Sequence, residues 1–314
     1  MLLTDPRRVL KSALLAAIVC AAPLCLFSGC GKSASDDVTV TMKSEDGTEE
    51  APEVAGSETP SEAAPAADAA PAAAGGIGDV VGTVVFDGTP PQLDAIIAQG
   101  ADVRDKEVCS AEAIPNEELI VNAENKGVQN VFVYLEKPPS GANAEPATDN
   151  AIFDQKGCRF LPHAMIVRTK QTILVLSDDP IAHNTHTFPK RNKVFNTAIK
   201  VNERDGVPLT YDRPEQVPVE VKCDFHPWMK AWHLPLDHGF AALTDENGKF
   251  EIKGLPAGTH SFRIWHEKGG ILDRGFKITV KPGDPEPVTI KFAADKFASF
   301  GGPAPRQTVV STLP

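Results

Sequence analysis

The chain has 314 residues, of which 42% are hydrophobic, 6% aromatic and 23% charged. This is enough apolar material for a sizeable core in two small domains, which excludes a wholly disordered chain. Lysine and arginine number 31 against 42 aspartates and glutamates, a formal net charge of −11, and there is no basic block that could follow a phosphate backbone. We therefore expect no nucleic-acid partner.

Proline and glycine are abundant, with 27 and 24 residues, and long amphipathic patterns with a period of 3.6 residues are hard to find. This composition favours an all-β chain and argues against a helical bundle. We expect a larger β-sandwich followed by a second, smaller one.

The N-terminus resembles a bacterial export signal. Basic residues precede an apolar run over 12–27 that is too short for a membrane span. The run ends in LFSGC at 26–30, which resembles the lipobox of bacterial lipoproteins, although Phe27 replaces the usual aliphatic residue. The resemblance implies a signal peptide over 1–29 and lipidation of Cys30, in an exported protein of the cell envelope or periplasm that is anchored to a membrane. A soluble exported protein is the alternative.

The segment that follows, 30–77, is rich in alanine, proline and acidic residues. Between positions 31 and 77 there are ten aspartates and glutamates against two lysines. Such a segment cannot bury enough apolar surface to order itself. We expect a disordered tether that lets a lipid-anchored domain stand off the membrane and meet partners.

Three cysteines remain for the folded part: Cys109, Cys158 and Cys223. In an oxidising compartment an odd number indicates one disulfide and one cysteine with another role. Cys223 is followed within six residues by histidine, proline and methionine, whereas the other two lie in polar, loop-like sequence. We expect a disulfide between Cys109 and Cys158 and a chemical role for Cys223. Two buried free thiols are the alternative, because sequence does not fix connectivity.

Cys223, His226 and Met229 follow the alternating stretch VPVEVKC in a C-x-x-H-x-x-M pattern. A short turn after a strand can direct all three side chains at one ion, and thiolate, imidazole and thioether form a soft donor set. One more imidazole is available from His183, which follows a predicted strand over 172–176. A core or loop role is the simpler interpretation of any one of these residues, but together their types and spacings favour a metal site.

The segment HNTH at 183–186, followed by CDFHPWM at 223–229, resembles the cupredoxins, which are small blue-copper electron carriers, and among them the amicyanins. The resemblance implies a Greek-key β-sandwich that holds one type 1 copper ion. The copper ligands it implies are His183, Cys223, His226 and Met229.

The same resemblance implies supporting roles for neighbouring residues. Asn184 would tie the histidine segment to the cysteine loop, and Pro227 would stiffen that loop. His226 would be the more exposed imidazole, with Trp228 beside it as an apolar docking patch. His186 and His233 are the histidines to reconsider if a second metal were present.

The sequence on either side of the HNTH and CDFHPWM segments is assigned to domains as follows. We assign 78–239 to the cupredoxin-like domain, with strands over 78–91 and 118–139 completing its sandwich. The segments 92–117 and 140–157 are then insertions joined through the expected disulfide.

After Asp237, short strands alternate with Asn-Gly and Leu-Pro-Ala-Gly turns. This pattern resembles the carboxypeptidase regulatory-like, transthyretin-like β-sandwich, which we assign to 240–293, leaving 294–314 as a tail. The order of the motifs also resembles exported bacterial proteins described as methylamine-utilisation-like or plastocyanin-like.

The leading hypothesis is a mononuclear copper protein that moves single electrons between redox protein partners and is not an enzyme, since the sequence has no catalytic constellation. One alternative is copper binding without redox traffic, as in sequestration or delivery. The other is a metal-free adhesion or scaffold protein built from two β-sandwiches.

Overall fold

The computed structural model describes residues 76–139 and 147–298. The expected signal peptide, most of the tether and the lipidation expected at Cys30 lie outside the described residues. No helix in the described part is long and apolar enough to cross a membrane.

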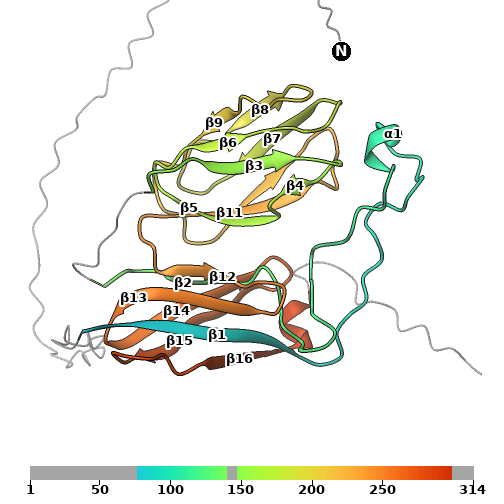
Figure 1. The fold of residues 1–314 in the computed structure, drawn as a ribbon. Helices are drawn as coiled ribbons and strands as arrows, with labels where there is room; N and C mark the ends of the chain where they lie inside the picture. Colours follow the sequence, from blue (N-terminus) through green and yellow to red (C-terminus); the bar gives the residue numbers. More distant parts are fainter. Residues whose placement is uncertain (1–75, 140–146, 299–314) are drawn as a thin grey trace, which may run out of the picture. The chain divides into compact units, whose positions relative to one another are not determined.

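Regular structure in the described residues is almost entirely β-strand, which confirms the expected all-β class. The strands form four sheets that pack in pairs into two sandwiches, and the helical elements are single turns (Figure 1). In chain order the elements are β1 (Ile77–Asp87), α1 (Lys106–Cys109), β2 (Phe132–Leu135), β3 (Ala151–Gln155), β4 (Phe160–Leu161), β5 (Ala164–Arg168), β6 (Ile173–Val175), β7 (His183–Phe188), β8 (Asn196–Ile199), β9 (Val207–Leu209), β10 (Val219–Lys222), β11 (Lys230–Leu236), β12 (Ala241–Leu243), β13 (Lys249–Pro256), β14 (Gly258–His266), β15 (Gly270–Val280), β16 (Val288–Ala293) and the 3-10 turn η1 (Ala294–Phe297).

The first sandwich, called here the central sandwich, comprises β3 to β11. One sheet has the strand order β5-β11-β10-β7-β8 and the other β4-β3-β6-β9. Apolar side chains from both sheets share one core, to which Phe153, Ile173 and Val221 contribute fully buried side chains. The short strands alternate inward and outward residues, so that each sheet buries one face against the other.

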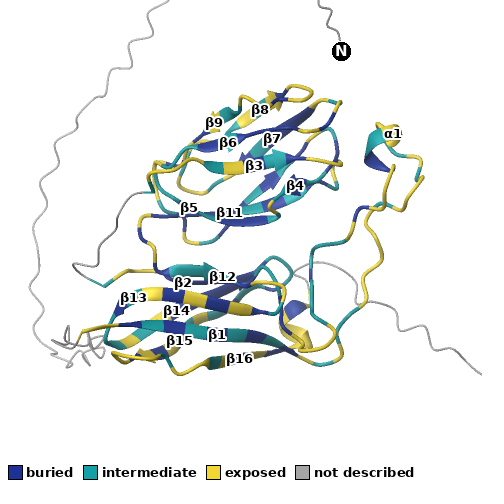
Figure 2. Cartoon of the chain, viewed as in Figure 1, coloured by how far each residue is buried: buried dark blue, intermediate teal, exposed yellow. Residues whose placement is uncertain are grey.

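The second sandwich, called here the split sandwich, takes strands from both sides of the central one in the sequence. Its sheets have the orders β13-β1-β16 and β12-β2-β14-β15. Figure 1 shows β1 lying between β13 and β16, and Figure 2 shows buried and more exposed residues alternating along β1 and β13. Val84, Val133, Leu255 and Phe262 are fully or almost fully buried in its core.

The structure corrects the expected domain division at 78–239 and 240–293. The stretches 78–91 and 118–139 do not complete the central sandwich: β1 pairs with β13 and β16, and β2 pairs with β12 and β14. Alternation along a strand predicts that it has one buried face, but not which sheet it joins. The central sandwich is therefore inserted into the split one.

Three smaller expectations also change. The stretch 118–122 is not a strand, because it forms only an isolated bridge between Val121 and Val128. The expected insertion at 140–157 contains β3, which pairs with β6 inside the central sandwich. The expected tail begins with η1, whose Phe297 is buried with its ring 5.5 Å from that of Phe86.

Candidate metal centre

Two neighbouring strands of the central sandwich bring the first two expected ligands together. His183 begins β7, and Cys223 directly follows the end of β10. The two strands are antiparallel, with His186 opposite Lys222, so the start of β7 lies beside the end of β10. The alternating burial of β10 continues to Cys223, whose side chain points inward.

The third donor lies on the loop between β10 and β11. The backbone amide of Met229 donates to the carbonyl of His226 at 2.9 Å, and the amide of Cys223 donates to the carbonyl of Met229 at 3.3 Å. These bonds fold the loop back on itself, which returns the imidazole of His226 toward the thiol. Pro227 occupies an exposed position in this turn, where its fixed φ suits a tight loop.

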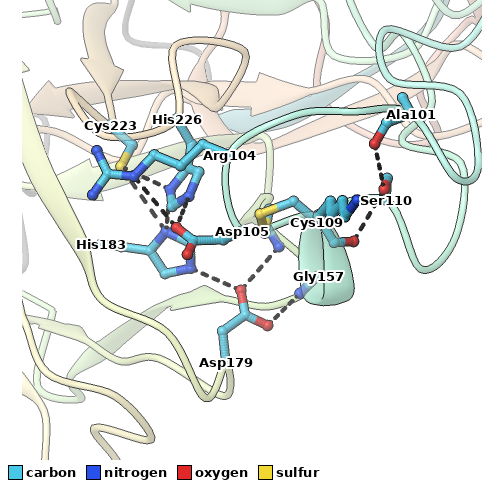
Figure 3. Close-up of a disulfide and its surroundings, with 12 residues drawn as sticks. Ala101, Arg104, Asp105, Cys109, Ser110, Gly157, Asp179, His183, Cys223 and His226 are labelled. Carbon is cyan, nitrogen blue, oxygen red and sulfur yellow. Dashed lines mark hydrogen bonds and ion pairs between the residues drawn. A yellow bond between two sulfur atoms is a disulfide. The ribbon is translucent and has the colours of Figure 1, made fainter.

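The three donor atoms form a compact, buried triangle (Figure 3). The Nδ1 atoms of His183 and His226 lie 3.0 Å apart, and Sγ of Cys223 lies 3.9 Å from the first and 3.7 Å from the second. The three residues are between 0% and 1% exposed. A point equidistant from the three atoms lies about 2 Å from each, close to the length of metal–nitrogen and metal–sulfur bonds.

Met229, expected as a weak fourth ligand, is 1% exposed and packs in the same core cluster as Cys223. Its backbone closes the loop, as described above. The role of its sulfur as a ligand stays a prediction.

The surroundings of Cys223 favour its thiolate. Burial by itself raises the pKa of the thiol, but hydrogen bonds from the side chains of His183 and His226 and from the backbone amides of Asn184 and His226 outweigh it. Together they lower the pKa from 9.0 to about 6. A thiolate is the form that binds a metal ion.

The outer nitrogen of each imidazole contacts a carboxylate. Nε2 of His183 lies 2.8 Å from Oδ2 of Asp179, and Nε2 of His226 lies 2.9 Å from Oδ2 of Asp105. Burial lowers the pKa of His183, but the bonds to Asp179 and Cys223 more than compensate and raise it. Carboxylates in this position orient a ligating imidazole and fix which nitrogen faces the metal.

The contact with Asp105 corrects one expectation, because His226 is 0% exposed and is not an accessible edge of the site. Neither carboxylate was predicted from the sequence. Asp179 stands four residues before His183, a local spacing that could have indicated it. Asp105 is 121 residues from His226 in the chain and had no such signal.

Asn184 lies where the resemblance suggested. Its Oδ1 accepts a 2.6 Å hydrogen bond from the backbone amide of Asp224, and its Nδ2 donates to the Asp224 carboxylate at 2.7 Å. It thus joins β7 to the residue that follows Cys223. His186, on the same strand, is half-buried and also contacts Asp224, with its Nδ1 3.2 Å from both carboxylate oxygens.

The structure joins Cys109 and Cys158 in a disulfide and leaves Cys223 as a free thiol. The sulfurs of the disulfide lie close to the donor triangle: both are within 4.8 Å of a ring nitrogen of His226, and that of Cys158 is equally close to His183. In the described residues, every group of three potential metal ligands includes His183 or His226. Trp228 contacts the ring of His226, with 5.3 Å between centroids.

Comparisons with known proteins give structural likeness only. No family model and no curated protein match the chain. It is similar to an amicyanin from Paracoccus versutus, with 17% identity, 34% of this chain and 99% of that one covered, and a TM-score of 0.25. A purple cupredoxin from Nitrosopumilus maritimus is similar at 17% identity over 27% of this chain and 99% of its own, with a TM-score of 0.24.

A copper-containing nitrite reductase from Thermus scotoductus SA-01 is also similar, at 17% identity and a TM-score of 0.25. The match covers 32% of this chain and 27% of the reductase chain. At TM-scores this low, none of these likenesses assigns the chain to a family.

Proposed function

We propose that the protein binds one copper ion at His183, Cys223 and His226, with Met229 as a weaker fourth ligand, and carries single electrons between protein partners. The observation that carries this proposal is the buried triangle of one thiol and two imidazoles. Two nitrogens and a sulfur with a distant thioether form the donor set of blue-copper centres. When bound there, copper would supply a one-electron couple.

The residues of the chain would do the remaining work. The carboxylates of Asp105 and Asp179 hold the imidazoles, so their Nδ1 atoms face the thiol. Asn184 fixes the loop relative to β7. Donors held this firmly need little rearrangement when the charge of a bound ion changes, which is what an electron carrier requires.

The decisive experiment is the visible absorption and electron paramagnetic resonance spectrum of the signal-free protein after addition of Cu(II). We expect an intense charge-transfer band between the thiolate and copper. Cys223→Ser should abolish the band, whereas His186→Ala, on the same strand but outside the triangle, should retain it. A folded, copper-exposed protein without this band would overturn the electron-carrier proposal.

Copper sequestration or delivery is the second candidate. The enclosure of His226 favours sequestration over delivery, because a covered ligand slows release of the metal. A site that keeps copper as Cu(I) would stay colourless after mild oxidation yet contain one equivalent of the metal. A metal-free scaffold predicts neither colour nor bound copper.

The cellular setting is part of the same proposal and is supported by the sequence of the N-terminus. Lipidation at Cys30 would anchor the chain to a membrane, with the acidic tether between the anchor and the folded part. Mass spectrometry of the mature N-terminus from a bacterial membrane fraction, with Cys30→Ser as the control, tests this. The resemblance of the split sandwich to carboxypeptidase regulatory-like modules stays a prediction.

A further inference from the structure

The connection between β1 and β2 supplies a compact segment, residues 101–110, that we call the cover segment. It contains α1 and is held together by its own bonds: Oγ of Ser110 donates to the carbonyls of Ala101 and Lys106, and the amide of Cys109 donates to the carbonyl of Asp105. Figure 3 shows this segment beside the donor triangle.

The cover segment contacts the loop between β10 and β11 through two neighbouring residues. Asp105 binds Nε2 of His226, and the guanidinium of Arg104 lies 5.2 Å from the ring centre of Phe225. Arg104 also approaches the Asp105 carboxylate at 3.4 Å, which holds it beside the imidazole. These contacts close the outer edge of His226.

Asp105 precedes the single turn of α1 with a φ of 52°, in the left-handed region that aspartate adopts more readily than most residues other than glycine. Its side chain makes no hydrogen bond to the helix, so the carboxylate is available to reach the imidazole of His226.

One disulfide connects both carboxylates of the site. Cys109 ends α1, four residues after Asp105, and is bonded to Cys158 of the central sandwich. The amides of Gly157 and Cys158 donate to the carboxylate of Asp179 at 2.6 and 2.9 Å. The disulfide therefore holds Asp105 over His226 and helps hold Asp179 against His183.

We infer that the cover segment is a disulfide-anchored cover for the donor triangle, in which Asp105 positions and shields His226 only while the Cys109–Cys158 disulfide is intact. The two cysteines are 1% and 0% exposed, so the bond is shielded from thiols in solution and acts as a lasting anchor. Without this bond, α1 would be released and the edge of His226 exposed to partners or chelators. Only the expected effect of the cover on metal release rests on the proposed function.

The test measures the accessibility of His226 without metal. Metal-free protein is treated with diethyl pyrocarbonate, and each histidine is quantified by mass spectrometry, both with the disulfide intact and in the Cys109→Ser/Cys158→Ser variant. We expect the modification rate of His226 to rise about tenfold when the disulfide is absent. His233 and His266, buried in the two cores, should stay unreactive and so report that the fold is intact.

Two variants with the disulfide intact separate the role of Asp105. Asp105→Ala should raise the reactivity of His226, whereas Asp105→Asn, which keeps a hydrogen-bond acceptor in place, should raise it less. Equal reactivity of His226 with and without the disulfide would overturn the inference. So would simultaneous exposure of His233 and His266, because the disulfide would then support the fold as a whole.

A second measurement links the cover to the metal. Release of Cu(II) to a chelator should be faster from the Cys109→Ser/Cys158→Ser variant than from the unaltered protein, and an unchanged release rate would refute control of metal exchange. If the protein binds no copper, the proposed function fails, whereas the histidine modification still decides whether the cover exists.

Discussion

Acidification should destabilise the fold through His233, an imidazole buried on β11 in the central sandwich. It is 0% exposed, and the edge of its ring packs against Phe153 with 4.4 Å between centroids. Nδ1 lies 3.1 Å from the hydroxyl of Tyr211, and Nε2 has no hydrogen-bond partner among the described residues. Burial lowers the pKa of His233 from 6.5 to about 3.

The sign and size of the effect follow from proton linkage. The unfolded chain binds a proton at this position as the pH falls through 6.5, whereas the folded chain does not until the pH reaches about 3. Stability is therefore unaffected above the unfolded pKa and is lost as the pH falls between the two values. Between about pH 7 and about pH 4 the loss attributable to His233 is about 3 kcal/mol.

The assay is denaturant unfolding of the metal-free protein at several pH values, followed by tryptophan fluorescence. The comparison is His233→Asn, whose amide can bond to the Tyr211 hydroxyl but cannot be protonated. We expect this variant to be less stable at neutral pH but to lose about 3 kcal/mol less on acidification. His266, whose pKa is lowered to about 4 by burial, contributes equally to both proteins and cancels. Parallel pH profiles for the two proteins would refute the reasoning.

Three further predictions concern the loop, the split sandwich and the disulfide. Asn184→Ala removes the acceptor of the 2.6 Å hydrogen bond from the backbone amide of Asp224. This variant should lower the free energy of unfolding by about 1–3 kcal/mol and speed copper release. An unchanged rate of copper release would contradict the role of Asn184 in joining β7 to the loop. Gly127→Ala would place a methyl group 2.1 Å from the carbonyl oxygen of Asn247. Thermal unfolding should therefore show that the free energy of unfolding falls by about 3 kcal/mol. An unchanged stability would refute this close packing. Replacing both disulfide cysteines with alanine removes a cross-link between residues 49 positions apart in the unfolded chain. Denaturant unfolding should show a loss of stability of about 4 kcal/mol. A loss below about 1 kcal/mol would mean that the unfolded chain is constrained in other ways.

The convergence of Cys223 and His226 could be predicted because it depends on local order. Cys223 and His226 share one short loop, and the resemblance placed His183 beside them. The structure adds the reason: β7 and β10 are antiparallel neighbours, so the beginning of one strand meets the end of the other. Sequence patterning is reliable for Cys223 and His226 because few arrangements of a short turn bury both side chains, whereas His183 lies 40 residues before Cys223 and was placed by the resemblance alone.

Contacts over long separations were not predictable in the same way. The alternation in β1 is regular over its whole length, yet that pattern is compatible with either sandwich, and only pairing with β13 and β16 decides. Asp105 lies in polar sequence that predicts a loop, and nothing near it indicates an imidazole partner. A single hydrogen bond between distant segments leaves no periodic trace in a sequence, whereas a buried face does.

The insertion of one sandwich into the other explains how these distant contacts arise. The chain leaves the split sandwich after β2 and returns to it at β12, and these two strands are hydrogen-bonded neighbours, with Tyr134 opposite Ala241. Both ends of the central sandwich are therefore fixed at one place, as in domains inserted through closely spaced termini. The connection between β1 and β2 joins two strands of the split sandwich, yet Cys109 and Ile114 on it are buried in the core of the central sandwich. This connection also carries Asp105, so one of the two carboxylates and half of the disulfide reach the donor triangle from a segment that precedes the inserted strands in the sequence.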